Sequence, residues 1–228
     1  MVPNFRDHTV QRDHNRQTVF VEDEDDHYYL ENLREWKDDP KIQLYGWCLM
    51  TNHIHLILEP GDDPKSISTL MKGINGRQSA YVNKLEWRTG SLWEGRYKAS
   101  PFQRDAYLLS CFRYVELNPV KAKMVACPKQ YRRSSYREKM STGEATMIDL
   151  DSCYLSVGRN TVDRQARYRV FVEQGVPALE QNFFAEACQR NQLSGNTCFV
   201  DEVERLLSVQ IGRRAPGRPV RCRSLDPI

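Results

Sequence analysis

The sequence predicts an α+β fold: a ferredoxin-like antiparallel sheet with helices on one face, followed by a C-terminal helical extension and a basic tail. Apolar patterns in the first half of the chain follow the order strand, helix, strand, strand, helix, strand, helix. Two strand patterns, 42–50 and 53–58, are separated by only two residues, which is typical of an antiparallel hairpin. After about residue 130 the pattern weakens into helical stretches.

Residue spacing justifies each of the first elements. Residues 5–11 start with apolar and polar side chains in alternation, which favours a strand, and a polar loop follows. Residues 24–38 place apolar side chains at helical spacing behind an acidic first turn, which suits a helix N-terminus. Asp39-Pro40 ends this helix. The aromatic-rich segment 42–50 and the segment 53–58 (HIHLIL) are the two hairpin strands.

A long helix, a short strand and a further helix complete the sheet domain. The helix at 66–85 has a continuous apolar side, although two glycines weaken its middle. Residues 92–100 are a loop leading into a short strand. The next helix covers 106–117, and Asn118-Pro119 marks its end.

Helical patterns return at 160–190 and at 199–208. We therefore expect three parts: a sheet domain at 1–137, a helical extension at 138–210 and a basic tail at 211–228. We find no internal repeats.

Composition indicates a globular protein. The 228 residues are 40% hydrophobic and 28% charged, and no apolar run is long enough to span a bilayer. The first residues lack the apolar core of a signal peptide, so we expect a cytoplasmic, nucleoid-associated protein. The seven cysteines are odd in number and show no Cys-x-x-Cys spacing, which favours reduced thiols over disulfides or a thiolate zinc site.

Charge is distributed unevenly along the chain. The net charge is only +3, yet residues 22–26 are all acidic. The stretch 213–223 carries five arginines and no acid, a pattern typical of nucleic-acid contacts. The alternative interpretation of this stretch is a solvated, disordered end, and the tail alone does not decide between the two.

The sharpest local feature is His53-Ile54-His55. Side chains alternate faces along a strand, so the two imidazoles lie side by side on one face. Such a pair can share one divalent ion. A bare His-x-His also occurs by chance as two ordinary histidines, but this pair lies on a strongly apolar strand, where it needs an explanation.

A second feature is the segment Tyr114-Val115-Glu116-Leu117-Asn118. Residues four apart on a helix project from one face, so Tyr114 and Asn118 point the same way. A helical tyrosine taken alone is more often a packed aromatic. Val115 and Leu117, however, provide other apolar positions for the core.

Together the two features suggest phosphodiester chemistry. A metal ion held by His53, His55 and the Asn118 amide oxygen would polarise a scissile phosphate, and Tyr114 would attack phosphorus to give a phosphotyrosine intermediate. A free phenol has a pKa of about 10, and a nearby divalent cation favours the phenolate. The intermediate conserves the phosphodiester energy, which suits strand transfer better than degradation.

Four segments of the sequence resemble one family. The segment 47–60 (WCLMTNHIHLILEP) is similar to the HUH motif, His-hydrophobic-His, of single-tyrosine, IS200-like transposases. Residues 9–17 (TVQRDHNRQ), 91–98 (SLWEGRYK) and 113–122 (RYVELNPVKA) resemble the subgroup of REP-associated tyrosine transposases. The resemblance covers about residues 5–137, and the four motifs occur in the expected order.

The resemblance implies an HUH endonuclease fold with the histidine pair on the central sheet. It implies Mg²⁺ or Mn²⁺ as the cofactor and a 5′-phosphotyrosine link to DNA. It also implies single-stranded, hairpin-forming repetitive extragenic palindromes as substrates. The resemblance also bears on the oligomeric state. Some members of the superfamily are dimers that exchange the tyrosine helix, whereas members of the repeat-associated subgroup act as monomers. We therefore expect a monomer here.

Two features of the motifs limit what is carried over. Asp13 stands where the family commonly has glycine after Gln-Arg, so the DNA contacts of this loop do not carry over directly from the family. The third metal ligand varies between related groups, so Asn118 rests on geometry and resemblance together.

The candidate DNA contacts are polar or basic groups in the matching motifs, with one aromatic and the tail. In the sheet domain they are Arg12, Asn15, Arg16, Asn52, Arg77, Trp93, Arg96 and Lys98. In the tail they are Arg213, Arg214, Arg218 and Arg221. Trp93 could stack on an unpaired base, and the alternative for it is a core tryptophan. The Gly217-Arg218-Pro219 step is similar to the core of minor-groove hooks.

Two other functions remain open at this point. One is a domesticated protein that binds repeat hairpins without cutting, although the intact set of catalytic residues argues against it. The other is a different HUH nuclease, such as a replication initiator or relaxase, although the short chain lacks a helicase-like phosphate loop.

Overall fold

A four-stranded antiparallel sheet forms the centre of the protein. The structure is a computed structural model that describes residues 5–38, 42–63, 65–102, 104–142 and 146–190. The strands are β1 (Arg6–Arg12), β2 (Gln43–Met50), β3 (His53–Glu59) and β4 (Lys98–Phe102). They pair antiparallel in the order β2-β3-β1-β4. This order is that of a ferredoxin-like sheet, so the predicted α+β fold class is confirmed.

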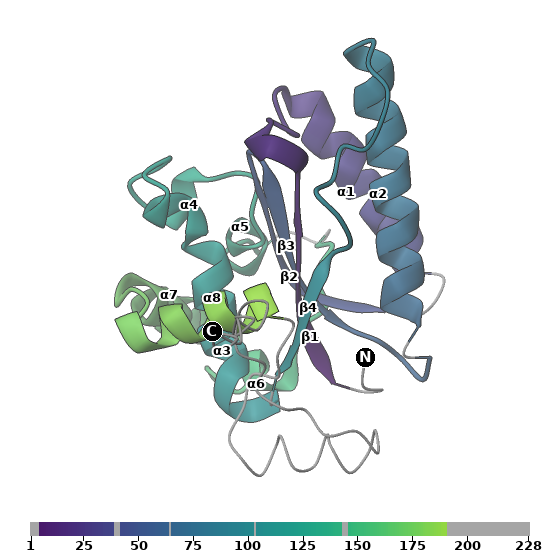
Figure 1. The fold of residues 1–228 in the computed structure, drawn as a ribbon. Coiled ribbons are helices and arrows are strands. Elements are labelled where there is room, and N and C mark those ends of the chain that lie inside the picture. The colour runs from purple at the N-terminus through teal and green to yellow at the C-terminus, as the bar shows by residue number, and fades with distance from the viewer. Residues whose placement is uncertain (1–4, 39–41, 64, 103, 143–145, 191–228) are drawn as a thin grey trace, which may run out of the picture.

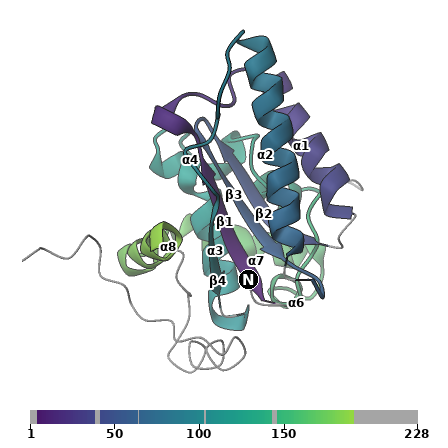
Figure 2. The ribbon, with the colours of Figure 1, turned by 45° about the vertical axis from the view of Figure 1, so that its right-hand side comes forward.

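Helices cover both faces of this sheet (Figures 1 and 2). Helices α1 (Asp23–Asp38) and α2 (Ser66–Leu85) lie on one face, as expected. Helix α3 (Arg104–Glu116) lies on the opposite face, together with the helices that follow it in the chain. These are α4 (Asn118–Lys121), α5 (Tyr136–Lys139), α6 (Ser152–Leu155), α7 (Thr161–Glu173) and α8 (Ala178–Arg190). Two short 3-10 turns, η1 (His14–Arg16) and η2 (Pro128–Gln130), complete the elements.

Two apolar cores result from the alternation of side chains along the strands. Ile54, Leu56 and Leu58 of β3 face α1 and α2 and belong to the first core. Ile57 of the same strand belongs to the second core, which contains Phe112 of α3 and the aromatic side chains of α7 and α8. The extension therefore closes the second face of the sheet. The helix expected at 199–208 and the tail lie outside the described residues.

The outer edge of β2 is covered by a segment that follows α3. The Leu49 amide donates to the Arg133 carbonyl at 2.9 Å, and the Ser135 amide donates to the Trp47 carbonyl at 2.9 Å. These bonds satisfy backbone groups that an uncovered edge strand would expose. The Tyr131 hydroxyl also donates to the Leu49 carbonyl, at 2.6 Å.

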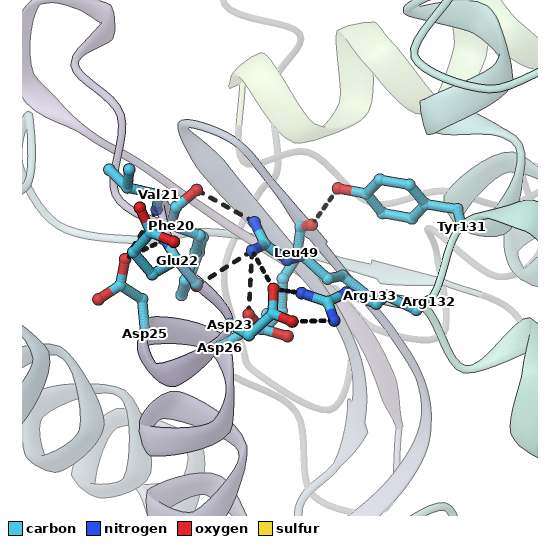
Figure 3. A network of polar contacts seen from close by, with 10 residues as sticks. All are labelled: Phe20, Val21, Glu22, Asp23, Asp25, Asp26, Leu49, Tyr131, Arg132 and Arg133. Carbon is cyan, nitrogen blue, oxygen red and sulfur yellow. Dashed lines mark hydrogen bonds and ion pairs between the residues drawn. The ribbon is translucent and has the colours of Figure 1, made fainter.

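The acidic run at the start of α1 is used internally (Figure 3). Arg133 donates to the Phe20 and Glu22 carbonyls, each at 3.0 Å, and pairs with Asp26 at 3.1 Å. Asp23 pairs with Arg132. The carboxylate of Asp25 accepts from the Val21 and Glu22 amides at 2.7 and 2.9 Å, which caps the helix N-terminus. The run thus fastens α1 to the segment on the β2 edge.

Further expectations from composition concern membranes and thiols. In the part of the chain that the structure describes, no helix is both long and apolar enough to cross a membrane. Cys48, Cys111, Cys127 and Cys153 are free thiols.

Glycine at position 73 permits the close packing of α2 on α1. A methyl group at Gly73 would lie 2.7 Å from the indole ring of Trp36, whereas one at Gly76 would meet nothing within 4 Å. Of the two glycines expected to weaken this helix, Gly73 is therefore required by helix packing and Gly76 is not.

We predict opposite effects for the two alanine substitutions. Gly73→Ala should lower the free energy of unfolding by about 1–3 kcal/mol, because the rigid indole must move. Gly76→Ala, the matched control, should raise it by about 0.5–1 kcal/mol through helix propensity alone. Urea denaturation followed by circular dichroism measures both. Equal effects of the two substitutions would contradict the packing assigned to Gly73.

Candidate active site

The two histidines of the His-x-His segment share the face of β3 that points away from α1 and α2. On the neighbouring strand β1, Val10 pairs with His55 and Arg12 pairs with His53. Between them Ile54 is buried in the first core. The predicted alternation along this strand is therefore observed, and both imidazoles face the layer that contains α3.

Tyr114 and Asn118 lie beside the histidines of the same chain. The ring centroids of Tyr114 and His55 are 6.2 Å apart, and Asn118 Nδ2 is 3.4 Å from His55 Nε2. All four side chains line one cavity of about 420 Å³. The structure thus brings together the four residues that the sequence singled out for chemistry.

The helical spacing of Tyr114 and Asn118 continues across a break in the helix. We expected the helix to cover 106–117 and to end at Asn118-Pro119; instead α3 begins at Arg104 and ends at Glu116, and α4 starts at Asn118. The Leu117 amide donates to the Arg113 carbonyl at 3.0 Å, and the Lys121 amide donates to the Leu117 carbonyl at 2.9 Å. Pro119 cannot donate, which accounts for the interruption without reversing the chain.

A third histidine, His8 of β1, contacts the pair. Its Nε2 lies 2.9 Å from Nδ1 of His55, and the two rings are stacked with centroids 5.1 Å apart. Sequence reasoning missed this residue, because its role depends on the register of β1 against β3. The alternation of residues 5–11 placed His8 on one face, but nothing local indicated its partner.

Burial keeps all three imidazoles neutral at neutral pH. It lowers the pKa of His8 to about 3, and burial with the nearby Arg12 guanidinium lowers the pKa of His53 to about 4. Burial, His53, His8 and Arg12, in that order, lower the pKa of His55 well below its usual value. Neutral imidazole is the form that binds metal ions.

Hydrogen bonds hold one nitrogen of each imidazole of the pair. Nδ1 of His53 lies 2.7 Å from Oδ1 of Asn52, an atom that only accepts, so this nitrogen is the donor. Nδ1 of His55 faces Nε2 of His8, and Nε2 of His55 faces the Asn118 amide. In both histidines Nδ1 is therefore held by a polar partner, as in known metal sites.

The spacing of Asn118 and His55 suits two ligands of one divalent ion. Two ligands about 2.1 Å from an ion lie about 3.0–3.4 Å apart, and the amide of Asn118 is 3.4 Å from Nε2 of His55. Rotation of the amide by half a turn presents its oxygen at the same place. The described residues contain no group of three His, Cys, Asp or Glu side chains placed to hold a metal, so an ion bound by the two histidines would take its further protein ligand from the Asn118 amide.

Basic side chains surround the same cavity. Arg12, Arg96 and Lys98, all expected as DNA contacts, line it together with Lys121. Sequence reasoning missed Lys121, although it lies seven residues after Tyr114, two helical turns along the same face. These cations suit a phosphate backbone.

Other expected DNA contacts lie elsewhere. Arg77 of α2 pairs with Glu35 of α1 at 2.5 Å, on the far side of the sheet. Trp93 is only 7% exposed and donates to the Asn75 carbonyl at 3.0 Å, which fits the core alternative and not base stacking. Asn15 is exposed on η1 with φ at 61°, and Arg16 is the last residue of the same turn.

The remaining candidates are placed as follows. Asn52 is hydrogen-bonded to His53, as described above. Asp13, the residue that stands at the family's glycine position, is buried, and its backbone pairs with that of Trp93 in an isolated β-bridge. Arg213, Arg214, Arg218 and Arg221 lie outside the described residues.

The last described helix packs over the tyrosine. The rings of Phe184 and Tyr114 have centroids 5.3 Å apart, and Tyr114 is 9% exposed. Arg113 of α3 pairs with Glu180 of α8 at 2.6 Å. The helical pattern at 160–190 predicted helices, which the structure contains as α7 and α8, but not that Phe184 would border the nucleophile candidate.

A buried polar network holds the catalytic helix from behind. The carboxylate of Glu116, two residues from Tyr114 and Asn118, accepts from Lys139 at 2.6 Å, Ser135 at 2.9 Å and Tyr168 at 2.7 Å. The side chains of Glu116 and Lys139 are each 1% exposed. The network joins α3 to α5, α7 and the segment on the β2 edge.

We predict that Lys139→Met lowers the free energy of unfolding by about 3–5 kcal/mol, because it leaves the Glu116 carboxylate buried without its cation. Adding Glu116→Gln should restore part of this loss, since a neutral amide needs no counter-charge. Urea denaturation of the wild type, both single variants and the double variant gives the coupling free energy. Additive losses would show that the two side chains do not interact.

Comparisons with known proteins are consistent with this arrangement. The family model described as "Transposase IS200 like" matches residues 1–118. A solved structure of a REP-associated tyrosine transposase bound to a REP hairpin is similar in fold, with a TM-score of 0.52 and 15% identity over 67% of this chain and 88% of that chain. A putative transposase from Deinococcus radiodurans matches with a TM-score of 0.37 and 19% identity, over 47% and 84% of the two chains. No curated protein matches this chain.

Proposed function

The chain belongs to the IS200-like transposase family, and on this premise we propose that it is a metal-dependent single-stranded DNA endonuclease and strand transferase. One observation carries the proposal: Tyr114 and the candidate ligands His53, His55 and Asn118 line a single cavity. The cavity thus contains a nucleophile, neutral nitrogen ligands and basic groups for phosphate. Such a set suits phosphodiester cleavage, and a protein that only binds DNA does not need it.

The proposed reaction is a transesterification at phosphorus. The Tyr114 oxygen forms a bond to the scissile phosphorus, the bond from phosphorus to the 3′ oxygen breaks, and the 3′ oxygen takes up a proton as the phenol loses one. The product is a 5′-phosphotyrosine and a free 3′-hydroxyl. Attack of a 3′-hydroxyl on the same phosphorus reverses the step and joins strands.

The chain's own groups hold the strand in place. Arg12, Arg96 and Lys98 would bind phosphates around the cavity, and the hydrogen bonds that join His55 to His8 and His53 to Asn52 keep the imidazoles oriented. A bound Mg²⁺ or Mn²⁺ would supply Lewis-acid activation of the phosphate and favour the phenolate. The two nitrogen ligands suit Mn²⁺ at least as well as Mg²⁺.

We propose hairpin-forming single-stranded DNA as the substrate. The REP-associated transposase of similar fold is described as bound to a REP hairpin, and the four sequence motifs resemble that subgroup. Because the tyrosine and the histidine pair meet within one chain, a monomer can assemble the whole site.

A protein that binds hairpins without cutting them is the second candidate. The observation that favours it is the burial of Tyr114 beneath Phe184, which limits access to the phenol. Cleavage would require α8 to shift, whereas binding would not. A covalent-adduct assay separates the two candidates.

We predict that the protein forms a covalent adduct with a labelled hairpin oligonucleotide taken from beside its own gene. With Mn²⁺ present, denaturing electrophoresis should show a slower protein band, and chelator should remove it. Tyr114→Phe should abolish the band and keep DNA binding within about twofold, since only the nucleophilic oxygen is lost. Tyr107→Phe is the control, because that ring stacks on Phe183 away from the cavity.

An adduct retained by Tyr114→Phe would place the nucleophile elsewhere. Tight hairpin binding by the wild type with no adduct under any metal condition would favour the binding protein.

We also predict that His8→Phe weakens Mn²⁺ binding about 10- to 100-fold, because His55 loses the partner that orients its ring. Isothermal titration calorimetry of the protein without DNA measures the affinity. His14→Phe is the matched control, since His14 is exposed on η1. Unchanged affinity in His8→Phe would show that His55 needs no support from β1.

A further inference from the structure

A second cavity lies on the other side of the tyrosine. It has a volume of about 350 Å³ and shares Tyr114, Asn118 and Lys121 with the catalytic cavity. Its remaining walls come from the end of α3, from α4, from the segment before η2 and from the junction of α7 and α8. The three shared side chains therefore form a partition with a cavity on each side.

The two cavities differ in chemistry. The catalytic cavity is bordered by Arg12, Arg96 and Lys98, which suit a charged backbone. The second cavity has mostly apolar walls, made by Leu117, Val120, Ala126, Pro128, Val172 and Val176. Besides Asn118 and Lys121 of the partition, its polar lining includes Glu173 and Gln181. Mostly apolar walls with a few polar groups are typical of a site for a small planar ligand.

We propose that the second cavity binds the unpaired base of a nucleotide next to the scissile phosphate. The inference rests on the proposed function, because the phosphate attacked by Tyr114 must lie at the partition. The nucleotides on its two sides then pass over the two cavities. An unstacked base offers an apolar face, which fits the second cavity, and leaves its phosphates to the cationic one.

The polar lining of the cavity indicates which bases fit. The carboxylate of Glu173 can only accept hydrogen bonds, and the Gln181 amide can both accept and donate. Adenine, cytosine and guanine each carry an exocyclic amino group with two N–H donors, whereas an unpaired thymine offers the single N3–H of its ring. Two acceptors, the Glu173 carboxylate and the Gln181 amide oxygen, therefore favour a base with an amino group over thymine.

Binding of modified oligonucleotides tests this site without any need for cleavage. In a Tyr114→Phe background, one base at a time is removed from a hairpin oligonucleotide from beside the gene, leaving the backbone intact. We expect one position next to the cleavage site where base removal weakens binding about tenfold or more. Val176→Trp, which fills the cavity, should weaken binding of the intact oligonucleotide by the same factor and remove the effect of that base.

Two further variants keep the test decisive. Val170→Trp is the control, because Val170 is 57% exposed on α7, and it should behave as the parent protein. Gln181→Ala leaves the apolar walls unchanged and should reduce the preference for an amino-bearing base over thymine at that position. This variant tests the proposal if Val176→Trp does not fold.

Equal effects of base removal in the parent and in Val176→Trp, with no change of preference in Gln181→Ala, would overturn the assignment. Tighter DNA binding by Val176→Trp would also overturn it, because the cavity would then hold a segment of the chain itself. Failure of the proposed function is a separate result, the absence of a Tyr114 adduct with unmodified DNA.

Discussion

The buried carboxylate of Glu116 is the constraint on which the arrangement of the active site depends. It lies between Tyr114 and Asn118 in sequence but points away from the cavity, into a set of donors from three other segments. A carboxylate without water is stable only while its donors stay in place. Helix α3 therefore cannot rotate or slide without breaking a paired, buried charge. Rigidity of this kind is what a nucleophile at Tyr114 and a metal ligand at Asn118 would require.

The sheet provides the other half of the geometry. β3 lies between β2 and β1, so its histidines cannot move independently of two neighbouring strands. His8 uses that position, because it reaches His55 from the adjacent strand and holds its Nδ1. Preorganised ligands reduce the cost of binding an ion and a phosphate. The site thus lies between two rigid units. One is the surface of β2, β3 and β1, which carries the imidazoles, and the other is α3, which is held by the contacts of Glu116.

Local patterns were sufficient to predict most of the fold and the centre of the site. The strand period revealed the shared face of His53 and His55, and the helical period revealed that of Tyr114 and Asn118. Interactions between distant segments were not predictable in this way. The role of His8 depends on strand register, and that of Phe184 depends on how α8 packs. Trp93 shows the reverse case: its motif allowed base stacking, and only tertiary packing showed that it is buried.

The extension borders the candidate site through its last described helix. α8 brings Phe184 to within ring contact of both Tyr114 and His8, so Tyr114 is bordered by the extension as closely as by the sheet. The same helix contributes Gln181 to the second cavity and Glu180 to the pair with Arg113. A shift of α8 would therefore change the surroundings of the phenol and the shape of that cavity at once. Under the proposed function, access of DNA to Tyr114 and recognition of a flanking base would thus be coupled through one helix.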